Sequence, residues 1–213
     1  MKSKTQKIES DTGFQRVIMN KQKTSKGKIV IVSGPSGVGK STICKEVVKR
    51  LDNACLSVSV TTRPRAETEV NGRDYWFVSP QQFRKRIDEG ALLEHAEVFG
   101  HLYGTPKDKV EDALASGKTI ILEIDVQGAK RVKSLYPDAA MIFIFPPTER
   151  ELAERIKSRG REKMEAAEKR LEGAGAEFVA AWQYYEYMVI NDDLEQAVKE
   201  VIQIIEQISG EKQ

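Results

Sequence analysis

The chain has 213 residues, of which 40% are hydrophobic and 31% charged, and its net charge is +2. These values are ordinary for a soluble protein with one sizeable core, and no apolar run approaches the roughly 18 residues of a membrane span. The two cysteines, Cys44 and Cys55, form no metal-binding or disulfide pattern. We therefore expect a cytoplasmic protein with one domain and no membrane partner.

The N-terminal end of the chain is strongly basic. Residues 1–28 contain eight Lys or Arg and two acids, a net charge of +6, so the other 185 residues together carry −4. No apolar segment follows the early lysines, as a secretory signal would require. We assign residues 1–27 to a disordered arm, with weak contacts to nucleic acid or another anionic surface as the alternative, and residues 209–213 to a tail.

A phosphate-binding loop follows the arm. Residues 28–33 are apolar and β-branched and predict a buried parallel strand, and the apolar positions of residues 42–51 share one helix face. Between them, residues 34–41 read G-x-x-x-x-G-K-S, a pattern whose backbone N–H groups and helix N-terminus bind phosphate. We expect Lys40 to reach the β- and γ-phosphates and the Ser41 hydroxyl to bind Mg²⁺. The predicted ATP-binding residues here are Gly34, Pro35, Ser36, Gly37, Val38, Gly39, Lys40, Ser41 and Thr42.

The next segment predicts a small β-rich insertion over residues 58–107. Residues 56–60 alternate as a half-buried strand, and a basic turn follows at residues 61–65. Asn71-Gly72 is a hairpin signal, and the aromatic residues 75–78 favour a strand. Ser79 is placed to cap a helix that runs to Gly90.

Strands and helices then alternate to the end of the chain. We predict strands at 119–125, 140–145 and 187–190, and helices at 107–116, 128–135, 148–156, 162–181 and 194–208. This alternation indicates an α/β fold, a three-layer structure with a parallel sheet. Glu123 and Asp125 end the first of these strands, where an acid completes the Mg²⁺ shell in phosphate-loop folds, and Asp125 is our preferred candidate, through a water.

Several motifs in this order resemble the guanylate kinase family. They are residues 33–37 (SGPSG), 57–63 (SVSVTTR), 72–78 (GRDYWFV), 93–96 (LEHA), 103–105 (YGT), 122–128 (LEIDVQG), 159–160 (RG) and 191–193 (NDD). The match covers residues 28–208, and the ordered set is far more specific than any single motif. The resemblance implies a kinase that uses Mg²⁺ and transfers the γ-phosphate of ATP to GMP, and to dGMP, as a monomer or homodimer. It divides the chain into a core (28–57, 108–147 and 172–208), a GMP-binding region (58–107) and a helical lid (148–171).

The resemblance also assigns the guanine-reading residues. A guanine edge presents two donors, N1–H and the exocyclic amine, and a carboxylate accepts both in a charge-assisted pair. In the family this carboxylate stands where Glu94 stands here, and Ser59 and Thr105 match the hydroxyl positions that read the guanine carbonyl. Glu123 and Asp125 complete the implied GMP site, with Asp125 assisting either the exocyclic amine or Mg²⁺.

The GMP phosphate needs a cationic cradle, for which Arg63, Tyr75 and Tyr103 match the family positions. The family usually has R-x-x-R in this loop, whereas here Ala66 occupies the second arginine position and Arg65 comes one residue early. Either Arg65 takes over this contact or the contact is lost.

The lid supplies further cations. Arg155, Arg159 and Arg170 match the family's lid arginines and join Lys40 and Arg63 as the expected catalytic residues. Phosphoryl transfer spreads charge over oxygens, so positioned cations carry the catalysis and no general base is obligatory. Asn191 matches the position beside the ATP base, with capping of the last helix as the structural alternative.

Three other functions share parts of this pattern. A GTPase would explain D-x-x-G at residues 125–128, but its N-K-x-D guanine motif does not follow. A non-catalytic guanylate-kinase-like scaffold characteristically loses parts of the ATP site, whereas Lys40, Ser41, Asp125 and Arg159 are present here. A ribose-phosphate kinase of the same fold would have no use for the guanine-reading set.

Overall fold

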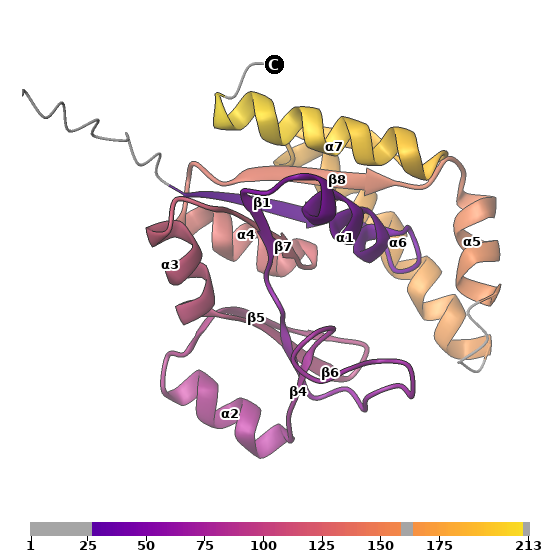
Figure 1. The fold of residues 1–213 in the computed structure, drawn as a ribbon. Coiled ribbons are helices and arrows are strands. Elements are labelled where there is room, and N and C mark those ends of the chain that lie inside the picture. Colours follow the sequence, from indigo (N-terminus) through magenta and orange to yellow (C-terminus); the bar gives the residue numbers. More distant parts are fainter. Residues whose placement is uncertain (1–26, 159–163, 211–213) are drawn as a thin grey trace, which may run out of the picture.

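The computed structural model describes residues 27–158 and 164–210, apart from the side chains of residues 157–172 (Figure 1). A parallel five-stranded sheet forms its centre, in the order β2-β7-β1-β8-β9. The strands are β1 (Lys28–Ser33), β2 (Ala54–Leu56), β7 (Thr119–Glu123), β8 (Ala140–Phe145) and β9 (Tyr187–Ile190). The sequence of β1 is apolar on both faces because helices cover both faces of the sheet.

The helices form two layers, and each layer packs on one face of the central sheet through its own hydrophobic cluster. Val30 and Val32 of β1 pack toward α1 (Lys40–Arg50) and α7 (Leu194–Ser209). Ile29 and Ile31 alternate with them and pack toward the opposite layer. That layer contains α3 (Lys107–Ala115), α4 (Val126–Leu135) and the C-terminal part of α6 (Met164–Tyr184). The predicted three-layer α/β class is therefore confirmed.

A second, smaller sheet lies below the central sheet in Figure 1. Its order is β4-β3-β6-β5, with strands β3 (Val60–Thr61), β4 (Trp76–Phe77), β5 (Leu92–Val98) and β6 (His101–Pro106). Helix α2 (Pro80–Asp88) begins with the capping box predicted at Ser79, since the Gln82 N–H donates to the Ser79 hydroxyl and the Gln82 side chain accepts from the Ser79 N–H. The sheet lies within the predicted β-rich insertion.

Two predicted elements in and near this insertion were wrong. Residues 56–60 are not one strand, because β2 ends at Leu56 in the central sheet and β3 begins at Val60 in the smaller one. Asn71-Gly72 forms a turn and not a hairpin, because β4 pairs in parallel with β3. The strand predicted at 119–125 occurs but ends two residues early, at Glu123, and Asp125 caps α4. The other predicted helices and strands occur within three residues of their predicted ends.

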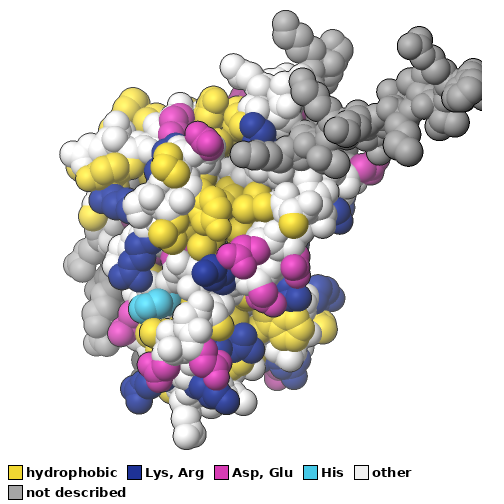
Figure 2. Space-filling model, turned by 90° about the vertical axis from the view of Figure 1, so that its left-hand side faces the viewer, with side chains coloured by type: hydrophobic (Ala, Val, Ile, Leu, Met, Phe, Trp, Pro, Cys, Tyr) yellow, Lys and Arg dark blue, Asp and Glu magenta, His cyan; other side chains and the backbone are white. Residues whose placement is uncertain are grey.

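Helices α5 (Glu149–Ser158) and α6 contain most of the predicted lid and lie beside the carboxyl end of β8 (Figure 1). The Glu151 N–H donates to the Thr148 hydroxyl at 3.1 Å, which is the predicted cap of α5. Among the helices that the structure describes, none is long and apolar enough to cross a membrane. Figure 2 shows acidic and basic side chains interspersed over one face of the molecule, as is usual for a water-exposed surface.

Candidate active site

The loop between β1 and α1 adopts a backbone conformation that favours glycine at several positions. Gly34 and Gly39 have φ values of 146° and 104°, which favour glycine, and a Cβ on Gly34 would lie 2.4 Å from the Ile144 carbonyl oxygen. Helix α1 begins at Lys40 with no side-chain cap and no acid in its first turn. Its N-terminal dipole therefore faces the loop without a negative side chain from its own first turn.

Lys40 and Asn191 stabilise this loop through hydrogen bonds to its carbonyl oxygens. The Lys40 ammonium donates to the carbonyl oxygens of Gly34 at 2.6 Å and Pro35 at 3.1 Å, so it lies across the loop. The buried Asn191 amide donates to the Val38 carbonyl at 2.7 Å. Both terminal nitrogens of Arg155 lie 3.2 Å from the Asn191 carbonyl oxygen, which connects α5 to the phosphate loop.

The acid beside the predicted metal ligand is Glu123. The Ser41 hydroxyl donates to Glu123 Oε1 at 2.6 Å. Asp125 lies beyond the end of β7, and its carboxylate accepts the Gly128 N–H at 2.9 Å as the cap of α4. In the structure, therefore, Glu123 contacts Ser41 while Asp125 caps α4, and the assignment of Asp125 to Mg²⁺ stays a prediction from the sequence.

The predicted guanine-reading acid comes from β5 of the smaller sheet. Glu94 is buried, and its Oε1 accepts a hydrogen bond from the buried Thr105 hydroxyl of β6 at 2.6 Å. Burial raises the pKa of Glu94 to about 7, which the hydrogen bond from Thr105 opposes and the negative charge of Asp125 reinforces. Half-buried Ser59 precedes β3 in the same sheet.

Three further predicted residues gather into one cationic and aromatic cluster. The Arg63 guanidinium carbon lies 5.3 Å from the centre of the Tyr75 ring, and the Tyr75 and Tyr103 rings are 6.0 Å apart. Arg63 also forms a two-pronged ion pair with Glu69, at 2.7 and 3.1 Å, which raises the pKa of the guanidinium. Burial and then the nearby Glu123 carboxylate raise the pKa of Tyr75.

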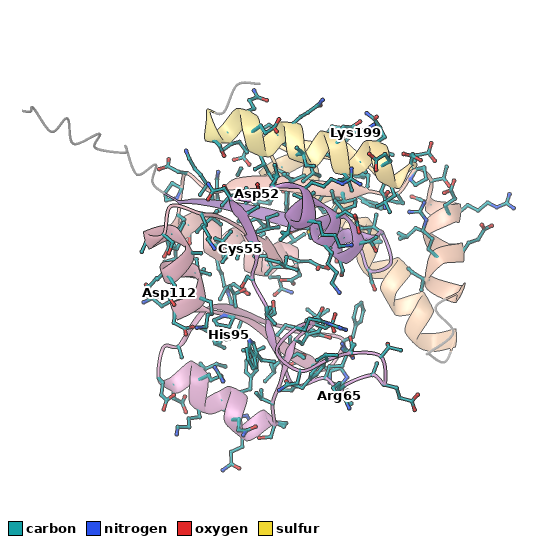
Figure 3. All side chains as sticks on the ribbon, in the orientation of Figure 1. Asp52, Cys55, Arg65, His95, Asp112 and Lys199 are labelled. Atoms are coloured by element: carbon teal, nitrogen blue, oxygen red, sulfur yellow. The ribbon has the colours of Figure 1, made fainter. Side chains whose placement is uncertain are left out.

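Arg65 lies in the loops of the smaller sheet (Figure 3) and contacts the same residue, Glu69, that pairs with Arg63. Its side chain is exposed, and it donates to the backbone carbonyl of Glu69 at 2.6 Å. Arg159 lies outside the described residues, and Arg170 belongs to the part of α6 whose side chains are not described. Their predicted roles therefore rest on the sequence.

Sequence reasoning missed three contacts that organise the site. Glu69 holds Arg63, although the two residues are separated by six positions with no periodic signal between them. Lys45 of α1 pairs at 2.7 Å with Asp74 of the insertion and, with other donors, lowers the pKa of Asp74. Arg131 of α4 donates to the His95 carbonyl of β5, which joins the central layers to the smaller sheet (Figure 3).

Comparison with known proteins places this geometry in one family. The family model described as guanylate kinase matches residues 26–208. A guanylate kinase from Carboxydothermus hydrogenoformans is 47% identical over 176 residues, 83% of this chain and 86% of that protein, and one from Thermotoga maritima is 46% identical over 84% and 86%. A crystal structure of guanylate kinase from Anaplasma phagocytophilum, 34% identical, superposes with a TM-score of 0.72 over 86% of each chain. The predicted resemblance is confirmed, and the chain belongs to the guanylate kinase family.

Proposed function

We propose that this protein is a guanylate kinase, which transfers the γ-phosphoryl group of ATP to GMP and to dGMP, giving ADP and the nucleoside diphosphate. The observation that carries the proposal is the buried Glu94 carboxylate beside Thr105, in the same molecule as an intact phosphate loop. Among the described residues no cation forms an ion pair with Glu94, and a buried carboxylate without such a partner is costly, so its retention needs a functional reason.

Guanine recognition supplies that reason. The Glu94 carboxylate accepts hydrogen bonds from guanine N1–H and the exocyclic amine, while the hydroxyls of Thr105 and Ser59 read the guanine carbonyl. Adenine carries an acceptor where guanine has N1–H, so Glu94 would repel it. Each hydrogen bond to a charged group contributes about 1.5–3 kcal/mol, which gives roughly ten- to a hundredfold discrimination.

ATP is bound by the phosphate loop together with Mg²⁺. The Ser41 hydroxyl and a Glu123 carboxylate oxygen lie 2.6 Å apart, and both are hard oxygen donors of the kind that Mg²⁺ takes, directly or through water. When bound, Mg²⁺ neutralises charge on the β- and γ-phosphates. Asp125, in contact with the first turn of α4, is assigned to the guanine side of the site.

Cationic side chains from three parts of the chain stabilise the transferring phosphoryl group. Lys40 leaves its loop carbonyls to reach the γ-phosphate, and Arg63, with the Tyr75 and Tyr103 hydroxyls, holds the GMP phosphate in line. The arginines proposed for the lid are Arg155, Arg159 and Arg170. The GMP oxygen attacks without an obligatory general base, because the loose transition state is stabilised mainly by positioning and charge.

A coupled ADP-release assay tests this function. Purified protein is given ATP and Mg²⁺ with GMP, dGMP, AMP, UMP or a ribose phosphate. We expect turnover with GMP and dGMP, and for Glu94→Gln a KM for GMP that rises roughly ten- to a hundredfold with little change in the KM for ATP. Folded protein that releases no ADP with GMP would refute the proposal, and turnover with a ribose phosphate alone would replace it.

A further inference from the structure

Gly128, in the first turn of α4, lies against the carboxylate that reads guanine. A Cβ at this position would lie 2.5 Å from Glu94 Oε2, 3.0 Å from Glu94 Cδ and 3.2 Å from Asp125 Oδ1. Carbon–oxygen contacts near 2.5 Å are not tolerated, so any other residue at position 128 forces the Glu94 carboxylate to move.

The backbone itself does not require glycine at this position. Gly128 is buried in α4 and is not among the described glycines with positive φ. Glycine inside a helix is about 1 kcal/mol less favourable than alanine, so the helix alone would favour alanine. The explanation left for this glycine is the close approach of Glu94.

The Glu94 carboxylate has little freedom to retreat from α4. On its other side Oε1 accepts the Thr105 hydroxyl at 2.6 Å, and both groups are buried. The hydrogen bond from Arg131 of α4 to the His95 carbonyl also holds β5 against this helix. The carboxylate is therefore confined between the Thr105 hydroxyl and the bare backbone of Gly128.

We propose that Gly128 is a positioning residue for guanine specificity, because its missing side chain leaves the space in which the Glu94 carboxylate sits. A methyl group at position 128 would turn the carboxylate away from the orientation in which both of its oxygens meet the guanine edge. The inference rests on the proposed function, since it concerns the same GMP site.

The test compares Gly128→Ala with Gly175→Ala, a matched control at an exposed glycine of α6, where an added Cβ would meet no neighbouring atom of the described residues within 4 Å. For Gly128→Ala we expect the KM for GMP, and the Kd for GMP from calorimetry, to rise at least about tenfold. The KM for ATP should stay near the wild-type value, and unfolding should stay cooperative. Gly175→Ala should leave the kinetics of both nucleotides unchanged.

A double mutant distinguishes a positioning role of Gly128 from a general loss of function. Glu94→Asp withdraws the carboxylate by one methylene group, so adding Gly128→Ala to it should cost little further GMP affinity, and the double-mutant cycle should show strong coupling. Wild-type GMP binding by Gly128→Ala, or equal losses for GMP and ATP, would overturn the inference, as would additive effects in the cycle. Failure of the proposed function itself would appear differently, as absent GMP turnover by the wild-type protein.

Discussion

Lowering the pH should weaken GMP binding through one buried carboxyl group. The pKa of Glu94 in the free protein is raised to about 7, first by burial and then by Asp125 against the opposing hydrogen bond of Thr105. Only the ionised carboxylate accepts both guanine donors, because a protonated carboxyl places a hydrogen toward one of them. GMP therefore selects the deprotonated form.

The magnitude follows from this pKa. About ten in eleven molecules carry the Glu94 carboxylate at pH 8, and about one in eleven at pH 6. The KM for GMP should therefore rise roughly tenfold across this interval, while GMP binding near pH 7 should release about half a proton. The pH dependence of folding stability has the opposite sign to that of GMP binding. A raised carboxyl pKa favours the folded state at acidic pH, and this contribution is lost as the pH rises from 4.5 to about 7.

Steady-state kinetics between pH 6 and 8.5, with calorimetry in buffers of different ionisation enthalpy, measures both effects. Glu94→Gln is the matched control, because the GMP phosphate also titrates, near pH 6, and this ionisation remains in the variant. We expect the difference between the two pH profiles to fit one group with a pKa near 7. Parallel profiles for wild type and Glu94→Gln would refute the reasoning.

The remaining predictions concern the phosphates. Lys40→Ala should lower kcat at least about a hundredfold with little change in Tm, because the ammonium contacts loop carbonyls and adds charge without filling the core. Loss of the cooperative unfolding transition in this variant would contradict the prediction. Glu123→Gln should raise the Mg²⁺ concentration needed for half-maximal rate about tenfold, and Asp125→Asn should raise it much less. A larger rise for Asp125→Asn than for Glu123→Gln would indicate that Asp125 is the metal-side acid. Arg65→Ala should raise the KM for GMP and lower kcat if this residue has replaced the arginine missing at Ala66, whereas wild-type kinetics would show that the contact is lost.

Local chemistry made much of this protein predictable. The apolar run of β1, the glycine-rich loop and the periodic face of α1 follow one another directly, so their pattern alone indicated a phosphate-binding strand–loop–helix unit. The helix at Ser79 and the helix at Thr148 were likewise predictable, because a cap is a contact between residues three positions apart.

The tertiary structure decided what depends on residues far apart in the chain. Residues 56–60 look like one strand, yet their ends pair with β7 in the central sheet and with β6 in the smaller one. Glu123, and not Asp125, meets Ser41 because β7 ends one residue before the segment that turns to cap α4. Gly128 and Glu94 are 34 residues apart in the chain, and only the packing of α4 on β5 brings them into contact. No local sequence pattern encodes such a contact.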